Sequence, residues 1–333
     1  MPRSLHLLAI GDATKDVFVD IEEATLSCTL NTEACLLCLN YADKIPVSSV
    51  TQIRAAGNAA NAAVGSSRLG HRSGLVTILG DDDDGHELQD ALKAERVDER
   101  FVTFDKKRGT NYSTILNFKS ERTLLAFHQP RTYRFPKNLP ETEWVYYSSL
   151  GEHHVPYEKQ LLAYLKKHME VRFLFNPGTH QLRRGLTSLL PVIKRSDVLI
   201  LNKEEAEHLL EDGARPVPAL VMRLFHEGPK TVVITDGQRG SWAYDGHDMW
   251  KLPIFPCKAL ERTGAGDAYA TGLVNALIDG KPIAEAMRAG NANSWSVVQE
   301  IGPQKGLLTA SEMRRVLKKF EKIRPQKVNH AAS

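Results

Sequence analysis

Apolar and polar positions along this chain follow two periods, one typical of buried strands and one typical of helices. The first apolar run, Leu5–Ile10, stops at Gly11-Asp12 and has the length and composition of a buried strand. Residues 57–69 are rich in alanine, have a helical pattern and end at Gly70, a helix stop signal. The chain therefore opens as a strand followed by a helix.

The alternation continues towards the C-terminus. Strands are expected at 75–79, 144–148, 173–175, 198–201 and 231–235, and helices after Gly85, near 157–167 and from about 203. The four aspartates 81–84 before one helix suggest either a metal site or an acidic turn that the helix dipole favours, and we expect the turn. Repeated strand–helix units predict a mostly parallel sheet covered on both faces, a three-layer α/β/α domain.

Two segments break this alternation. Residues 110–127 alternate apolar and polar positions around a Lys-Ser-Glu-Arg turn, which predicts a β-hairpin, and residues 17–21 alternate in the same way. We therefore expect residues 15–52 and 109–135 to form a small β-sheet lid, inserted into an α/β domain made of residues 1–14, 53–108 and 136–333. Exposed edge strands in such a lid make a homodimer through the lid plausible.

Composition and charge narrow the class of protein. Hydrophobic residues make up 42% and charged residues 25% of the 333, as in an ordinary globular protein. A net charge of +3 argues against a dedicated nucleic-acid binder, and the basic tail 314–327 resembles a solvated helix end. No window of 18 apolar residues occurs and the opening run is too short for a signal peptide, so we expect a cytoplasmic protein without membrane contacts.

Four cysteines, at 28, 35, 38 and 257, do not indicate a secreted disulfide framework in a chain of this length. Cys35-Leu-Leu-Cys38 has metal-ligand or redox spacing, but a structural zinc site needs four ligands and no second pair is present. We expect two buried thiols on a strand. The sequence leaves open whether Cys28, Cys35 and Cys38 bind a metal.

The segment with the clearest chemistry is Thr263-Gly264-Ala265-Gly266-Asp267, which precedes a helix of small residues. Glycines at a helix start let backbone N–H groups converge on an anion at the positive end of the helix dipole. Asp267 in the first turn could then take a proton from a hydroxyl that attacks a phosphoryl group. A tight turn with Asp267 as an ordinary helix-start residue is the alternative. Tyr269 excludes a dinucleotide fingerprint, and no P-loop occurs.

Five motifs in order make the chain resemble the ribokinase-like, PfkB-type family of small-molecule kinases. They are Ala56-Gly57-Asn58-Ala59-Ala60-Asn61 closing at Gly70, Gly80-Asp81, Asn202-Lys203-Glu204-Glu205, Thr235-Asp236-Gly237-Gln238-Arg239-Gly240, and the segment 263–267. Gly11-Asp12 followed by Asp16 opens the chain as in these kinases. The resemblance covers almost the whole length and implies the ribokinase-like fold.

The resemblance also implies roles for residues. Asp267 would be the catalytic base, and the backbone of Gly264, Ala265 and Gly266 the hole for the transferred phosphoryl group. Thr235, Gly237 and Gly240 would line the ATP site, where glycine leaves room for the nucleotide. Asn202 and Glu205 lie one helical turn apart and would position Mg²⁺, with Glu205 as the metal residue; a helix cap with a surface glutamate is the alternative.

On the acceptor side, Asp16, Gly57 and Asn61 match family positions that bind substrate hydroxyls, and the lid would exclude water. Asn291 is a candidate for an adenine contact. Glu261-Arg262 replaces the Asp-Thr that often precedes the anion hole, which puts activation by a monovalent cation in doubt. We expect an ATP-dependent kinase of a sugar hydroxyl; a nucleoside kinase or a non-catalytic binding protein of the same fold are the alternatives.

Overall fold

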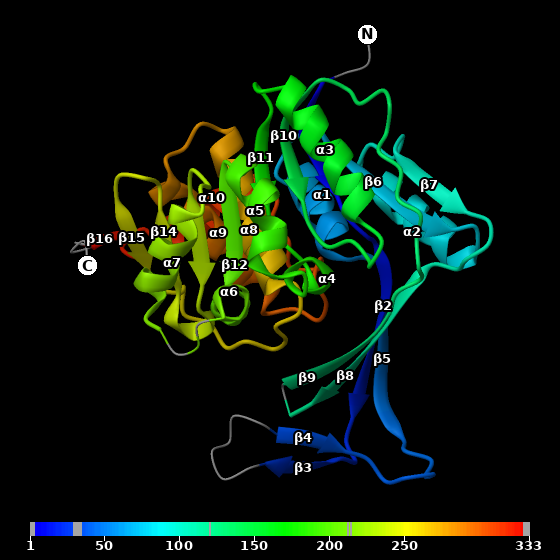
Figure 1. The fold of residues 1–333 in the computed structure, drawn as a ribbon. Helices are drawn as coiled ribbons and strands as arrows, with labels where there is room; N and C mark the ends of the chain where they lie inside the picture. Colours follow the sequence, from blue (N-terminus) through cyan, green and yellow to red (C-terminus); the bar gives the residue numbers. More distant parts are fainter. Residues whose placement is uncertain (1–3, 29–34, 120, 212, 214, 329–333) are drawn as a thin grey trace.

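The computed structural model describes residues 4–28, 35–119, 121–211, 213 and 215–328. Within these ranges, ten strands form one large sheet (Figure 1). In spatial order they are β16 (Gln326–Val328), β15 (Met249–Leu252), β14 (Ser241–Tyr244), β13 (Val232–Thr235), β12 (Val198–Asn202), β11 (Arg172–Phe175), β10 (Thr142–Tyr147), β1 (Leu5–Ile10), β6 (Ser73–Gly80) and β7 (Val102–Asp105). Strands β13 to β7 pair in parallel, whereas β14, β15 and β16 extend the sheet in antiparallel fashion. The prediction of a mostly parallel sheet is confirmed.

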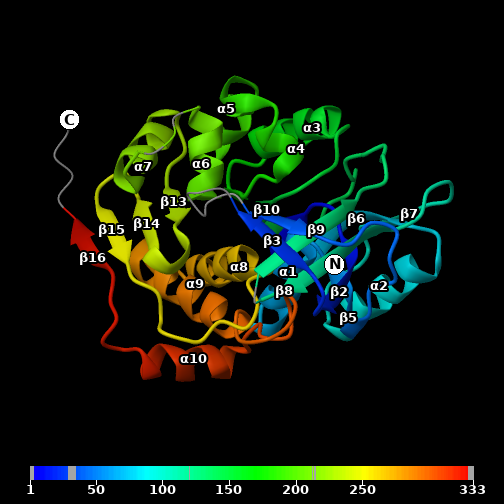
Figure 2. The same ribbon diagram turned by 90° about the horizontal axis from the view of Figure 1, so that it is seen from below.

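Helices cover both faces of this sheet (Figure 2). One face carries α1 (Asn58–Arg68), α2 (Asp83–Ala94), α8 (Ala265–Ile278), α9 (Ile283–Val297) and α10 (Ala310–Lys319). The other carries α3 (Val155–Lys167), α4 (Thr179–Leu182), α5 (Gly185–Arg195), α6 (Lys203–Leu210) and α7 (Val217–His226). The predicted α/β/α arrangement is therefore present.

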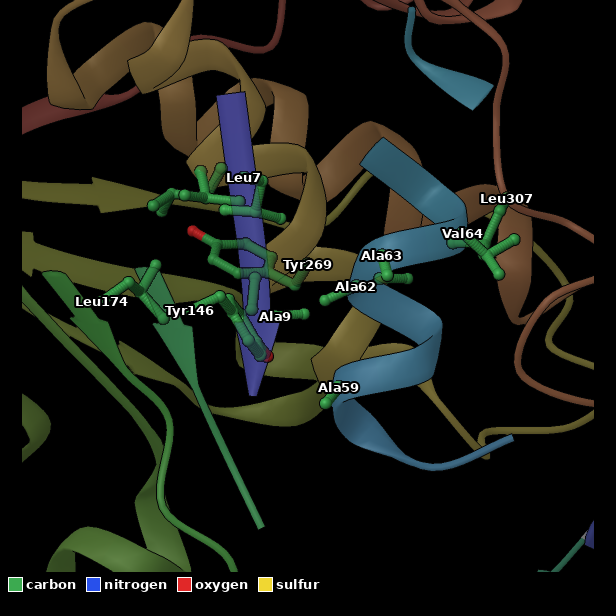
Figure 3. Close-up of a cluster of buried hydrophobic side chains, with 14 of the residues drawn as sticks. Leu7, Ala9, Ala59, Ala62, Ala63, Val64, Tyr146, Leu174, Tyr269 and Leu307 are labelled. Carbon is green, nitrogen blue, oxygen red and sulfur yellow. The ribbon is translucent and has the colours of Figure 1, made fainter. Parts of the chain in front are cut away.

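Strand β1 is apolar on both faces, because its side chains alternate between two faces that are each covered by helices. Leu7 and Ala9 belong to the hydrophobic cluster under α1 and α8, whereas Leu8 and Ile10 belong to the cluster on the opposite face. Figure 3 shows the first cluster, where small alanines of α1 face the β1 side chains. Because alanine is small, α1 lies close to the sheet, and this brings its first turn to the ends of the parallel strands.

A second sheet projects away from the large one (Figure 1). Among the described residues it contains β5 (Val47–Ala56), β2 (Thr14–Ile21), β8 (Asn111–Phe118) and β9 (Glu121–Phe127), in that order. Strands β8 and β9 are the predicted hairpin, and β2 pairs with β8 in parallel. Its segments fall within the region expected to be a lid, although β5 continues to Ala56 and the later Tyr133 packs in the hydrophobic cluster of the large sheet. Its action as a lid remains a prediction.

Polar contacts fasten the base of this small sheet to the body. Asp82 caps α2 through Gly85 N–H and also accepts from the N–H and hydroxyl of Thr110, at 2.8 and 2.6 Å. The predicted acidic turn before a helix is thus confirmed, and its carboxylate has a second partner. Lys15 of β2 pairs with Asp84 on the same helix.

The cysteine prediction is wrong. Cys28 and Cys35 form a disulfide between β3 (Thr25–Cys28) and β4 (Cys35–Cys38), a two-stranded hairpin. Cys35 is exposed and Cys38 half-buried, because this hairpin lies outside both sheets and has no core to enter. Within the described ranges, no group of three or more metal-binding side chains surrounds these cysteines.

The basic tail 314–327 is not simply a helix end, because after α10 the residues of β16 pair with β15 at the sheet edge.

No helix of the described residues has the length and apolar character needed to cross a membrane.

Candidate active site

A cleft of about 400 Å³ lies where the carboxyl ends of the parallel strands meet the base of the small sheet. Asp12 follows β1, Asn202 ends β12 and Thr235 ends β13, so the parallel topology brings these distant residues to one place. The cleft is lined by ten of the predicted site residues: Asp16, Gly57, Asn61, Asn202, Glu205, Thr235, Gly264, Ala265, Gly266 and Asp267.

The N-terminus of α8 forms one wall of the cleft. Gly264, its N-cap, has φ 75°, and a Cβ there would lie 2.3 Å from Cβ of Pro303, so this glycine is required by backbone and packing together. No steric constraint of this kind requires glycine at Gly266, because a Cβ built on it meets nothing within 4 Å. Ala265 N–H donates to the carbonyl oxygen of Arg262 at 3.2 Å, whereas the N–H groups of Gly266 and Asp267 have no acceptor among the described residues and lie at the positive end of a 14-residue helix. The open space at Gly266 lets an anion approach them.

Asp267 lies in the first turn of α8 and accepts a hydrogen bond at Oδ2 from Nδ2 of Asn61, at 2.8 Å. Burial raises the pKa of Asp267 to about 6, and the Asn61 bond partly offsets that rise. A carboxylate with this pKa is ionised at neutral pH and is still basic enough to accept a proton.

Asp16 on β2 is 5% exposed, and its Oδ1 has no hydrogen-bond partner among the described residues. Burial raises the pKa of Asp16 to about 7; the hydroxyls of Ser113 and Thr14 lower it, and the charge of Asp267 raises it further. A buried acceptor without a donor is costly. A ligand hydroxyl that donates to Oδ1 would remove this cost.

Asp12 is a cleft residue that the sequence analysis did not assign to the site. Tyr133 donates its hydroxyl to both carboxylate oxygens, at 2.9 and 2.7 Å, and Gly151 N–H donates to Oδ2 at 2.9 Å. Burial raises the pKa of Asp12 to about 6. Its position directly after the first buried strand was the available signal, since cleft residues of parallel sheets follow strand ends.

Asn202 and Glu205 form a reciprocal cap on α6. The side chain of Asn202 accepts from Glu205 N–H at 2.7 Å, and Oε2 of Glu205 accepts from Asn202 N–H at 2.9 Å. The helix-cap alternative is therefore present, but Glu205 is no ordinary surface residue: it is half-buried, lines the cleft, and burial raises its pKa to about 7. Oε2 is used by the cap, and Oε1 makes no hydrogen bond within the described part of the chain.

Three predicted nucleotide-site residues do not line this cleft: Gly237, Gly240 and Asn291. Gly237 is open, with no atom within 4 Å of an added Cβ, whereas a Cβ at Gly240 would lie 2.1 Å from the carbonyl oxygen of Leu252. The side chain of Asn291 donates to Pro253 O at 2.9 Å and accepts from Phe255 N–H at 3.4 Å. Gly240 and Asn291 thus have structural roles, and their contact with a nucleotide remains a prediction.

Glu261 and Arg262, the residues expected to disfavour a monovalent cation, differ in their partners. Glu261 is buried: its Oε1 accepts from the N–H and hydroxyl of Thr263, at 2.6 and 2.5 Å, with Arg122 at 3.8 Å, whereas its Oε2 has no hydrogen-bond partner among the described residues. Arg262 lines the cleft and pairs with Glu121 of β9 at 3.1 Å.

Comparison with known proteins places this geometry in a family. The profile of pfkB family carbohydrate kinases matches residues 20–310, so Asp12 and Asp16 precede the matched range. The 5-dehydro-2-deoxygluconokinase of Bacillus subtilis is 25% identical over 280 residues, 78% of this chain and 86% of the relative. The probable fructokinase-7 of Arabidopsis thaliana is 28% identical over 272 residues, 74% of this chain and 78% of the relative.

Solved structures of similar fold span nearly the whole chain. The ribokinase of Arabidopsis thaliana, complexed with ribose and ATP, superposes with a TM-score of 0.76 at 19% identity, covering 95% of this chain and 99% of its own. The nucleoside kinase of Methanocaldococcus jannaschii gives 0.73 at 22% identity, with 94% and 98% covered. At these identities the likeness concerns the fold.

Proposed function

The chain belongs to the pfkB family of carbohydrate kinases, and from this premise we propose that it transfers the γ-phosphoryl group of ATP to a sugar hydroxyl in the cleft. One observation supports the proposal above all others. One cleft of about 400 Å³ brings together three groups. They are the Asp267 carboxylate, which can accept a proton, the helix N-terminus at Gly266, and Oδ1 of Asp16, a buried acceptor without a donor.

Asp267 is the proposed general base. As the acceptor oxygen forms its bond to the γ-phosphorus, the bond from that phosphorus to the ADP oxygen breaks, and the hydroxyl proton passes to Asp267. With a pKa of about 6, Asp267 is ionised at pH 7 and above. The N–H groups at the start of α8 stabilise the charge of the transferred group.

The residues present fit ATP and Mg²⁺. The anion-binding turn has room at Gly266, and Glu205 offers a carboxylate oxygen beside it in the same cleft. We propose that Glu205 and Asn202 hold Mg²⁺ through its waters, and the ion when bound neutralises phosphate charge. Thr235 and the open Gly237 would lie along the nucleotide.

The proposed acceptor site consists of Asp16, Asn61 and the turn at Gly57. Gly57 has φ 99°, and a Cβ there would lie 2.7 Å from the carbonyl oxygen of Asp12, so glycine lets α1 start close to the strand end. Asn61 has two N–H groups on Nδ2, so it can bind Asp267 and an acceptor hydroxyl together.

A coupled assay of ADP release over pentoses, hexoses, inositol and nucleosides tests the proposal. Transfer to a sugar, slowed roughly 10²- to 10⁴-fold in Asp267→Asn, is the expected result. Transfer to nucleosides alone would favour the nucleoside-kinase alternative. Saturable sugar binding without any ADP release would favour a non-catalytic binding protein.

A further inference from the structure

The segment 302–306, which connects the end of α9 to α10, reaches the candidate base through a second layer of contacts. Pro303 packs against Gly264, the N-cap of α8. Gln304, half-buried, donates from Nε2 to the carbonyl oxygen of Ala55 and to Oδ1 of Asn61, the latter at 3.0 Å. Asn61 in turn donates to Asp267. A side chain outside the predicted site thus sits two hydrogen bonds from the base.

The donor and acceptor roles in this series of hydrogen bonds follow from the bond to Ala55. The Ala55 oxygen is a backbone carbonyl and can only accept, so Gln304 must present its NH₂ group there. The same nitrogen then donates to Asn61, which must present its oxygen. The amide nitrogen of Asn61 is left facing Asp267.

We propose that Gln304 is a positioning residue that holds the Asn61 amide with its N–H group, and not its carbonyl, towards Asp267. If Asn61 were flipped, its oxygen would face a carboxylate and its nitrogen would face the Gln304 nitrogen, so both bonds would be lost. This inference rests on the proposed role of Asp267 as the base.

The backbone of Gln304 is itself held by a side chain of α1. Arg68 at the end of α1 donates from Nη1 to the backbone oxygen of Gln304 at 2.5 Å. The same guanidinium binds both carboxylate oxygens of Glu95, at 2.9 and 2.6 Å. A charged pair between α1 and the end of α2 therefore fixes the backbone that carries the Gln304 side chain, and side-chain substitutions at 304 leave this support in place.

Other titratable and charged groups lie around the cleft, and a pH test must allow for them. They are Asp16 on β2, Glu205 on α6, Tyr146 on β10, Arg122 on β9 and Arg262 in the turn before α8. A neutral substitution at 304 changes none of these charges, so a change in the titration of Asp267 reports the amide of Asn61.

The decisive comparison is Gln304→Met with Gln304→Lys. Met has a similar volume and no donor, whereas Lys supplies donors only. We expect Gln304→Met to lower kcat about 10- to 100-fold, as loss of an orienting partner does, with KM for ATP nearly unchanged. The acid limb of the kcat/KM profile should move to higher pH, because Asp267 loses a donor that favours its charged form. Gln304→Lys should keep more activity than Gln304→Met.

The matched control is Gln299→Met, which removes a glutamine whose Nε2 donates to Trp295 O outside the cleft; its kcat should stay at the wild-type value. A packing role for Gln304 predicts the opposite order, with Met tolerated and Lys harmful, and an unmoved acid limb; either result overturns the proposal. If the wild-type protein phosphorylates nothing, the proposed function fails, but ¹³C NMR titration of the Asp267 carboxyl still decides. A higher Asp267 pKa in Gln304→Met supports the inference, and an unchanged one overturns it.

Discussion

The large and the small sheet place their residues by different means. On β1 of the large sheet Leu7 and Leu8 are fully buried on opposite faces, so packing on both sides fixes the strand. On β9 of the small sheet every residue is exposed, with Leu124 at 48% and Leu125 at 54%. The proposed catalytic residues lie on well-packed elements of the large sheet, whereas the proposed lid over the acceptor includes an exposed strand.

This difference predicts where substitutions act. Asp267 and the turn 264–266 belong to a helix packed on the large sheet, so their geometry is held before a ligand arrives. The residues of β9 that line the cleft are exposed, so packing constrains their side chains less. We expect changes in the body to alter kcat or stability and changes in the small sheet to alter KM.

The largest effect should come from Asp267→Asn. A near-isosteric amide keeps the helix start but accepts no proton, and loss of a general base costs roughly 10²- to 10⁴-fold in kcat. ATP affinity, measured by calorimetry, should change little. Asp245→Asn, in the turn between β14 and β15, is the control for charge removal. Retention of half the wild-type turnover would remove Asp267 from the chemistry.

The same variant should change stability with pH. Because the pKa of Asp267 is raised in the folded protein, its ionisation disfavours folding once the pH exceeds the unfolded value of 3.8, and the cost is complete above about 6. Asp267→Asn should therefore raise the melting temperature at pH 8 and have less effect at pH 4. Equal effects at both pH values would contradict the raised pKa.

A stability contrast between the sheets should come next. Leu8→Ala empties a fully buried site and should lower the free energy of unfolding by about 2–5 kcal/mol, whereas Leu125→Ala should stay within about 0.5 kcal/mol. Urea unfolding measures both. A large, concentration-dependent loss in Leu125→Ala would mean that a second copy covers the small sheet, as the homodimer prediction requires.

At pH 8, where Asp16 with its pKa of about 7 is mostly ionised, Asp16→Asn should raise the KM of the acceptor about tenfold, because a hydrogen bond to a charged group is replaced by one to a neutral amide. KM for ATP should not change. Asp20→Asn is the matched control on the same strand, since Asp20 accepts from Asn117 and Ser49 and does not line the cleft. An equal rise in both variants would indicate a general effect on β2.

Within β9, two neighbouring leucines sharpen the contrast. Leu124 lines the cleft and Leu125 does not, although their exposures are similar. Leu124→Ala should raise the acceptor KM roughly three- to tenfold through lost apolar contact, with kcat kept, whereas Leu125→Ala should not. If neither variant changes KM, the small sheet does not close over the acceptor.

The smallest effect concerns potassium. The Arg262 guanidinium beside the cleft disfavours a bound monovalent cation, whereas Oε2 of Glu261 is buried without a hydrogen-bond partner among the described residues. Replacing K⁺ by a bulky organic cation at constant ionic strength should change kcat less than about twofold. A several-fold loss would show that Arg262 leaves room for the ion.

Local sequence patterns were sufficient to predict much of the fold of this protein. The two sheets could be predicted from the buried runs, the alanine-rich segment and the period two of 110–127. A strand buried on both faces, a helix buried along one stripe and a strand buried on one face each space their apolar residues differently. Gly264-Ala265-Gly266-Asp267 could be read in the same way, since a helix start is local.

Tertiary structure decided what depends on residues far apart in the chain. The bonds of Asp12 to Tyr133 and the contact of Gln304 with Asn61 join segments whose approach no spacing encodes. The same holds for Asp16, whose pKa and unpaired oxygen arise from what surrounds it. Sequence determines which groups a segment can offer, and the packed fold determines which of them remain without a partner and so stay available for chemistry.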